Sequence, residues 1–178
     1  MISQEDIVGL WREKPSDYGV VKVWDRKEKS HYDKTIFRKF KCYGKVPDFR
    51  PEVEKSYMYS PSSEMPLSVF MMLNEVKKEF GPEYNQVIIN WYDEGDYIEP
   101  HRDCTNFLVE DTPIIVYYWS EEMTKVKFEA VNTKVNPDHL YLKGTGRYFL
   151  NRRTNQNYRH SINSENGKYM SISFRAIK

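Results

Sequence analysis

After Gly81 the sequence contains a series of short segments in which apolar and aromatic side chains recur at every second residue. This period is that of a half-buried β-strand. Turn signals such as DEGD, NPD, KGTG and SENGK separate the segments. The segments span residues 86–92, 112–119, 125–131, 139–143, 147–151, 158–163 and 169–177. Seven short strands in succession predict a β-sandwich or barrel.

The first 44 residues mix helix and strand signals. Residues 3–15 predict a short helix, because Ser3 and Asp6 have the spacing of a capping box and Pro15 would end it. Residues 18–24 and 34–44 predict strands, and the charged stretch 25–33 between them predicts a loop.

Residues 66–80 are the best candidate for a longer helix. Pro66 suits the first turn, and Gly81-Pro82 predicts the end. One apolar stripe at helical spacing is expected to pack against a face of the barrel. It comprises Leu67, Phe70, Met71, Leu73 and Val76.

Charge and cysteine content limit the classes of partner and compartment. With 27 basic and 26 acidic residues, the chain has no general attraction for polyanions, so a nucleic-acid contact would need a local patch. Cys42 and Cys104 are too few for a disulfide framework, which predicts a reducing intracellular compartment, cytoplasmic or nuclear. No apolar run approaches the roughly 20 residues that cross a bilayer, and the N-terminus lacks the apolar core of a secretory signal. We therefore expect no membrane association.

The pair His101 and Asp103 is the clearest candidate for metal binding. Side chains two apart on a strand point the same way, but these two alone leave a divalent metal under-coordinated. Of the other histidines, His31 lies in the charged stretch, His139 follows a turn and His160 lies in a late predicted strand. Two histidines and a carboxylate on adjoining strands match the ligand set of non-haem iron oxygenases. A zinc hydrolase is an alternative, and so is a polar strand end with a hydrogen-bonded core histidine.

A second polar set lies on two predicted strands. An arginine on the inner face of a barrel is costly unless it meets an anion, and its planar fork fits a carboxylate. The alternatives are an exposed arginine near the chain end and a tyrosine of the core. The alternating inner positions are Asn90 and Tyr92 on one strand and Tyr169, Ser171, Ser173 and Arg175 on the other.

Two longer segments carry a resemblance to a known family. NWYDEGDYIEPHRD (90–103) and LNRRTNQNYRHSINSENGKYMSISFR (150–175) resemble the AlkB family of Fe(II)- and 2-oxoglutarate-dependent dioxygenases, in particular its nucleic-acid repair branch. The similarity runs from about residue 34 to the C-terminus. It implies a double-stranded β-helix, or jelly roll, and the use of molecular oxygen. The implied reaction is the oxidative demethylation of N-alkylated bases in DNA or RNA, with release of formaldehyde and succinate.

The resemblance also implies roles for individual residues. The last strand of the family usually carries a further arginine, and Tyr169 stands at that position here. The implied ligands of Fe(II) are His101, Asp103 and His160, and the implied contacts to 2-oxoglutarate are Asn90, Tyr92, Arg175 and Tyr169.

The segments FRKFKCYG (37–44) and SYMYS (56–60) are similar to the strands that form a lid over a flipped nucleotide in the family. By this resemblance Tyr57 and Tyr59 would grip the base, and Arg38, with Arg152 and Arg153, would contact phosphate. Cys104 stands where repair members carry an acidic residue that contacts the base, so the resemblance does not fix which methylated base is accepted.

Taken together, these observations predict a mainly β (α+β) protein with one domain over 1–178, expected to act as a monomer. Residues 1–65 would form the N-terminal helix and the lid strands, and 66–178 a helix and the jelly-roll core. Two other functions stay open: an oxygenase of the same fold acting on a protein or small molecule, and a non-catalytic nucleic-acid-binding module.

Overall fold

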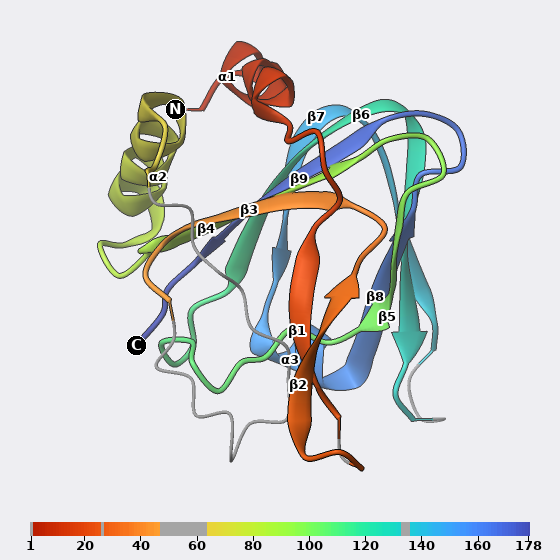
Figure 1. Ribbon diagram of the computed structural model, residues 1–178. Coiled ribbons are helices and arrows are strands. Elements are labelled where there is room, and N and C mark those ends of the chain that lie inside the picture. Colours follow the sequence, from red (N-terminus) through yellow and green to blue (C-terminus); the bar gives the residue numbers. More distant parts are fainter. Residues whose placement is uncertain (1, 26, 47–63, 133–135) are drawn as a thin grey trace.

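The computed structural model describes residues 2–25, 27–46, 64–132 and 136–178. Antiparallel strands make up most of it, and the helices lie outside the main sheet (Figure 1). The helices are α1 (Gln4–Gly9), continued by a 3-10 turn (Leu10–Glu13), α2 (Leu67–Phe80) and α3 (Arg152–Asn157). The strands are β1 (Val20–Asp25), β2 (Ser30–Thr35), β3 (Lys39–Gly44), β4 (Gln86–Tyr92), β5 (Tyr97–His101), β6 (Ile114–Ala130), β7 (Asp138–Leu150), β8 (Tyr158–Asn163) and β9 (Tyr169–Arg175).

The main sheet curls because β6 belongs to both of its halves. The strand order is β3-β4-β9-β6-β8-β5, with β7 also paired to β6. Residues 115–120 of β6 pair with β9, whereas residues 125–130 pair with β8. Between these stretches the register with β7 shifts, from Ser120 to Thr124. Such an irregularity bends a strand. The two halves therefore face each other, and the expected mainly β, jelly-roll type of fold is confirmed.

Several predicted boundaries are wrong. Segments 112–119 and 125–131 are one strand, β6, and segments 139–143 and 147–151 are one strand, β7. The expected KGTG turn lies inside β7, where Gly144 has a φ of +68° and pairs with Ser120 at the irregularity of β6. Turn residues can thus serve a bend within a long strand. The charged stretch 25–33 is also not a loop throughout, because β2 begins at Ser30 and pairs with β1.

The N-terminal helix is capped as its sequence predicts. The Ser3 hydroxyl accepts a hydrogen bond from the Asp6 backbone at 3.1 Å, and the Asp6 carboxylate accepts one from the Ser3 backbone at 2.8 Å. The Trp91 indole of β4 donates to the Leu10 carbonyl at 3.0 Å, which attaches this helical segment to the sheet. No helix in the described ranges is long and apolar enough to span a bilayer.

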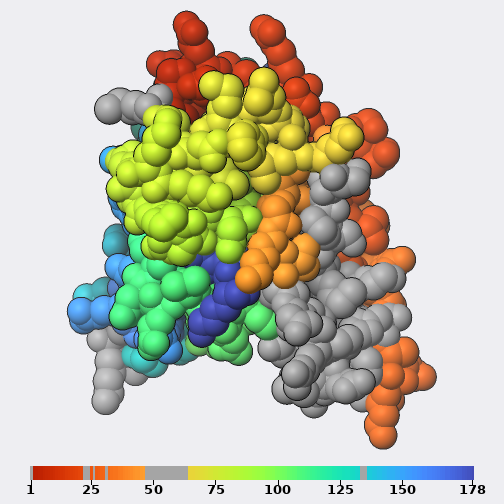
Figure 2. Space-filling view, turned by 90° about the vertical axis from the view of Figure 1, so that its left-hand side faces the viewer, coloured from red at the N-terminus to blue at the C-terminus, as the bar shows by residue number. Residues whose placement is uncertain are grey.

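Helix α2 packs through a different face from the one predicted. Leu73 and Val76 are buried as expected, but the other buried positions are Val69 and Met72. The predicted positions Leu67, Phe70 and Met71 are 72%, 50% and 60% exposed. The first two turns are apolar on several sides, so the sequence allows more than one stripe, and contact with the sheet selects one. Figure 2 shows α2, in yellow and yellow-green, across one face of the molecule.

Two apolar clusters lie on opposite faces of β4 and β9. The outer cluster, which includes Ile89 and Ile172, packs against α1 and α2. The inner cluster, which includes Tyr92, Ile162 and Tyr169, lies between the two halves of the sheet. Successive strand residues alternate between these faces. The polar residues of β4 and β9 that face inward are thereby directed toward β5 and β8.

Candidate metal and co-substrate site

Three side chains from separate parts of the sheet converge between its halves. His101, the last residue of β5, is the register partner of His160 in β8, and their ring centroids lie 4.3 Å apart. Asp103 brings a carboxylate oxygen to 3.6 Å from Nε2 of His160. One ligand atom from each of the three lies within 4.8 Å of the others. We call these residues the triad.

Asp103 reaches the triad from a different backbone position than the sequence predicted. The sequence placed His101 and Asp103 on one strand, but β5 ends at His101 and Asp103 lies beyond it. Asn155 of α3 holds this stretch: the Asp103 backbone N–H donates to its Oδ1 at 2.9 Å, and its Nδ2 donates to the Asp103 carbonyl at 2.5 Å. No pattern in the sequence predicted this role for Asn155. The only signal was its place in the segment that carries the family resemblance.

The protonation states of the triad suit a divalent cation. Burial lowers the pKa of His101, and it lowers that of His160 to about 4. Burial alone would raise the pKa of Asp103, but Arg175, together with the two imidazoles, outweighs it and lowers this pKa. At neutral pH the triad is thus two neutral imidazoles and a carboxylate, the forms that bind metals.

The orientation of the triad is also fixed by neighbouring groups. Nδ1 of His101 lies 2.9 Å from the Glu99 carbonyl; its proton is donated there, which leaves Nε2 for a metal. Nη2 of Arg175 donates to Oδ1 of Asp103 at 2.7 Å. Oδ2 of the same carboxylate faces His160.

A cavity of about 40 Å³ opens beside the triad. Nε of Arg38 donates to Oδ1 of Asn90 at 2.9 Å, and Nδ2 of Asn90 donates to the Ser171 hydroxyl at 3.4 Å. The polar side chains that line the cavity with the triad are Arg38, Asn90, Tyr92, Tyr148, Ser171, Ser173 and Arg175. The structure thus brings Asn90, Tyr92 and Arg175 together with the triad.

The positions of two tyrosines relative to the cavity were not predicted from the sequence. Tyr148 of β7 lines the cavity although no sequence signal singled it out. Tyr169 is not among the lining residues: it is fully buried, with its ring centroid 5.5 Å from that of Tyr92. It therefore stands behind the wall of the cavity rather than in it.

A second, larger hollow adjoins the triad on the side of the β1-β2 hairpin. This groove has a volume of about 270 Å³, and it shares Arg38, Ile98 and His101 with the cavity. The rings of Phe37 and Tyr97 stack in its wall, with centroids 5.0 Å apart and an angle of 17° between their planes. Sequence reasoning missed the groove because its two rings come from segments 60 residues apart. We call it the aromatic groove.

The remaining candidate residues lie elsewhere. Tyr57 and Tyr59 fall outside the described residues. Cys104 follows Asp103 and is exposed, and Arg153 is exposed at the beginning of α3. His139 is exposed at the beginning of β7 and does not belong to the triad.

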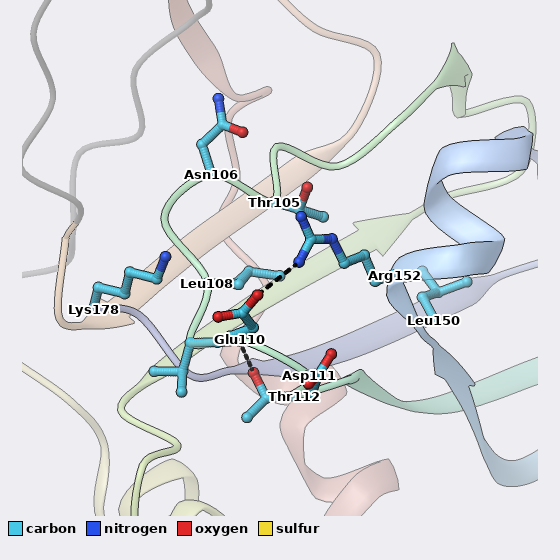
Figure 3. Close-up of a pocket in the computed structure, with 10 residues that line it drawn as sticks. Thr105, Asn106, Leu108, Glu110, Asp111, Thr112, Leu150, Arg152 and Lys178 are labelled. Carbon is cyan, nitrogen blue, oxygen red and sulfur yellow. Dashed lines mark hydrogen bonds and ion pairs between the residues drawn. The ribbon is translucent and has the colours of Figure 1, made fainter.

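Another pocket, larger than the aromatic groove, lies apart from the triad. It has a volume of about 380 Å³ and is lined by loop residues 105–106 and 108–112 and by Leu150, Arg152 and Lys178. Figure 3 shows Arg152 directed toward Glu110, and these side chains pair at 3.4 Å. Leu150 is its one residue in common with the cavity beside the triad. Arg152, expected to contact phosphate, is thus engaged by an acidic neighbour.

Comparisons with known proteins show which solved structures have a similar fold. A scan against protein-family models found no match, and neither did a search of curated proteins. A 2OG-Fe(II) oxygenase family protein from Burkholderia pseudomallei aligns over 96% of this chain and 76% of its own, with a TM-score of 0.53 and 12% identity. The structure of OsALKBH1 aligns over 97% of this chain and 90% of its own, with a TM-score of 0.52 and 13% identity. At such identities the likeness concerns the fold alone. The chain has the curled antiparallel architecture of these oxygenase structures.

Proposed function

We propose that this protein is an Fe(II)- and 2-oxoglutarate-dependent dioxygenase that demethylates N-alkylated bases in DNA or RNA. The observation that carries the proposal is the triad in the wall of a polar cavity, with the aromatic groove beside it. The fold, which it shares with oxygenase structures, is consistent with this chemistry.

The donor set fits ferrous iron. Two imidazoles and one carboxylate leave neighbouring coordination positions open, which is the arrangement of non-haem iron oxygenases. His101, Asp103 and His160 would hold the metal, and Asn90, Tyr92 and Arg175 would hold 2-oxoglutarate. Bound together with oxygen, these cofactors supply the oxidation of a C–H bond of an N-methyl group, from which formaldehyde and succinate result.

The chain's own residues would keep the site in order. Arg175 and Asn155 fix Asp103 from its side chain and its backbone, so the carboxylate is directed at the metal position before the metal binds. Arg38 holds the amide of Asn90 with its Nδ2 turned toward β9. The side chains of His160 and Asp103 are 10% and 9% exposed, which limits the access of water to them.

The aromatic groove supports a nucleobase as the substrate. The Phe37 ring stacks on Tyr97 and meets the ring of Tyr18 edge-on at 6.5 Å. The side chain is still 53% exposed, so part of the ring is available to a planar ligand. Stacking of a base on an aromatic ring contributes roughly 1–3 kcal/mol. Lys34 and Arg38 bring positive charge to the groove, and Glu99 brings one negative charge. A contact with phosphate there would depend mainly on Lys34, because Arg38 is buried.

The test is turnover on oligonucleotides that carry one N-methylated base. Iron-loaded protein with 2-oxoglutarate and oxygen should release succinate and formaldehyde and restore the unmodified base, as followed by mass spectrometry on single and double strands. The same oligonucleotide without the methyl group is the control. Succinate release that ignores the oligonucleotide would indicate an oxygenase for a protein or small molecule. Oligonucleotide binding without turnover, in protein with a full complement of iron, would indicate a binding module.

A pair of variants tests the groove itself. Phe37→Ala should raise KM for the methylated strand by about tenfold, which corresponds to the loss of one stacking contact. Tyr141→Ala is the matched control, because Tyr141 of β7 is 63% exposed and does not line the groove. Equal effects of the two substitutions on KM would show that the groove is not part of the substrate site.

A further inference from the structure

Tyr18 lies between the N-terminal helical segment and β1, and it is not among the residues that line the aromatic groove. Its side chain is 44% exposed, and an exposed tyrosine is ordinarily free to change rotamer. Here three other side chains contact it. The Tyr18 hydroxyl donates to Oδ1 of Asp96 at 2.8 Å, and Nζ of Lys39 lies 4.4 Å from the centroid of the ring. The third contact is with the ring of Phe37, edge-on, with centroids 6.5 Å apart.

Asp96, which accepts the hydrogen bond from Tyr18, is itself held in place between β4 and β5. It is 4% exposed. Its second oxygen, Oδ2, accepts from the Asp93 backbone N–H at 2.9 Å and lies 3.8 Å from Nζ of Lys39. The Ser164 backbone N–H, after β8, donates to the Asp96 carbonyl at 3.0 Å. Because the carboxylate and the backbone of Asp96 are both bound, the Tyr18 hydroxyl is attached to a fixed, buried group.

Phe37 lies where the chain passes from the β1-β2 hairpin to β3. Its carbonyl accepts from the Tyr97 backbone N–H at 3.0 Å, and the carbonyl of Arg38 accepts from the Gly19 N–H at 2.9 Å. The Tyr97 ring is inclined by 17° to the Phe37 ring, whereas the Tyr18 ring is inclined by 65°. The two tyrosines therefore contact Phe37 in different ways, one by stacking and one edge-on.

These contacts bear on how well the groove can bind a planar ligand. A side chain that is half exposed, as Phe37 is, has several staggered rotamers available unless neighbours exclude them. A ligand that stacks on a mobile ring must immobilise it, and this reduces the affinity. A ring that is already ordered avoids that loss. Tyr18 can therefore improve binding without touching the ligand.

We propose that Tyr18, anchored on Asp96, is a positioning residue that keeps Phe37 stacked on Tyr97 and so orders the aromatic groove before the methylated base binds. This inference rests on the proposed function, because it takes the base as the ligand of the groove from it. It adds a residue outside the groove on which substrate affinity depends. A residue that only attached the N-terminal segment to the sheet would affect stability but not the stacking of Phe37.

A double-mutant cycle on turnover of the methylated oligonucleotide separates the two roles. In iron-loaded protein with 2-oxoglutarate, Tyr18→Ala should raise KM by about fivefold and leave kcat within about twofold of wild type. Tyr18→Phe keeps the ring but loses the bond to Asp96, so an intermediate KM is expected. When Phe37→Ala is already present, Tyr18→Ala should change KM by less than about 1.5-fold, because the ring that it positions is gone.

Val20→Ala is the control for the cycle, since Val20 begins the same hairpin, is 54% exposed and does not line the groove. It should leave KM unchanged. An unchanged KM in folded Tyr18→Ala protein would overturn the inference. So would an increase in KM by the same factor with and without the Phe37 ring, because Tyr18 would then act by another route.

Nuclear magnetic resonance tests the inference without any substrate. In protein with 13C-labelled phenylalanine, the ring signals of Phe37 are those absent from the spectrum of Phe37→Leu. The change in their chemical shifts caused by Tyr97→Leu measures the stacking of the two rings. This change should be smaller in Tyr18→Ala protein than in wild type. An equal change in both would show that Phe37 stacks without the help of Tyr18, and the inference would be wrong.

The two measurements also separate this inference from the proposed function. If no methylated oligonucleotide is demethylated but the Phe37 signals respond to Tyr18→Ala as expected, the proposed function is wrong and Tyr18 still orders the groove. If demethylation occurs and neither KM nor the Phe37 signals depend on Tyr18, only the inference is wrong.

Discussion

The outer face of β4 and β9 belongs to an apolar core, whereas the inner face lines the proposed site. On the outer face Ile89, Trp91 and Ile172 are fully buried in the cluster that packs against α1 and α2. On the inner face, Asn90 and Arg175 surround a small cavity with the triad. Neighbouring residues of one strand therefore serve different purposes, and the alternation of side chains keeps them apart. Substitutions on the two faces should have separable effects.

The largest effect is expected at the triad. His160→Ala removes one of the three proposed ligands and should weaken metal binding by at least about 1,000-fold, while the midpoint of thermal unfolding changes little. Asp103 keeps its ion pair with Arg175 in this variant, so no new unpaired charge is created. His139→Ala, on an exposed histidine, is the control. Retention of metal by the His160 variant at wild-type affinity would refute the ligand assignment.

The opposite outcome is expected on the outer face. Ile172 is fully buried in the outer cluster, and Ile172→Ala should lower the free energy of unfolding by about 2–5 kcal/mol. Metal affinity of the folded protein should stay within about twofold of wild type, since the side chain points away from the cavity. Denaturant unfolding and metal titration measure the two quantities. A large loss of metal affinity would mean that the faces are coupled.

Substitutions of Asn155 test how far metal binding depends on its hydrogen bonds to the backbone of Asp103. Asn155→Ala removes two hydrogen bonds to the backbone of Asp103 and should weaken metal binding by about 10–100-fold. Asn155→Asp is the matched variant: it restores the acceptor for the Asp103 N–H but not the donor, so an intermediate affinity is expected. If both variants bind metal like wild type, the strand end alone orients the ligand.

The smallest effect concerns a polar contact that contributes to stability rather than chemistry. Asp93, after β4, pairs with Lys14 at 2.5 Å and with Lys39 at 2.6 Å. Burial acts to raise its pKa, but the two ammonium groups outweigh burial and lower it below the ordinary 3.8. A lowered folded-state pKa stabilises the protein above pH 3.8, and this stabilisation is lost as the pH falls through the folded value.

Thermal unfolding between pH 6 and pH 2 measures this contribution. Wild type should lose about 1 kcal/mol more stability on acidification than Asp93→Asn, because the side chain is 32% exposed and solvent weakens the pairs. The pH dependence of metal-free protein should be used, so that the triad does not contribute. Parallel curves for the two proteins would show that these ion pairs add nothing.

Much of the fold was predictable because strand alternation is a local property. The period of two identified β4 and β9, and it assigned Asn90 and Arg175 to inner faces. The boundaries of β6 and β7 were not predictable, because a turn-like sequence can either reverse a chain or bend a strand that continues. The sequence also did not specify which face of α2 packs against the sheet, because its apolar residues form more than one stripe.

For the site, the local sequence specifies the residue types of the proposed ligands and the nearness of His101 to Asp103, which lie two residues apart in the chain. That His160 meets them depends on the pairing of β5 with β8. The stacking of Phe37 on Tyr97 and the place of Tyr148 in the wall of the cavity likewise depend on the folded arrangement. Contacts between distant segments depend on strand order and register, and these follow from the packing of the whole chain rather than from any local pattern.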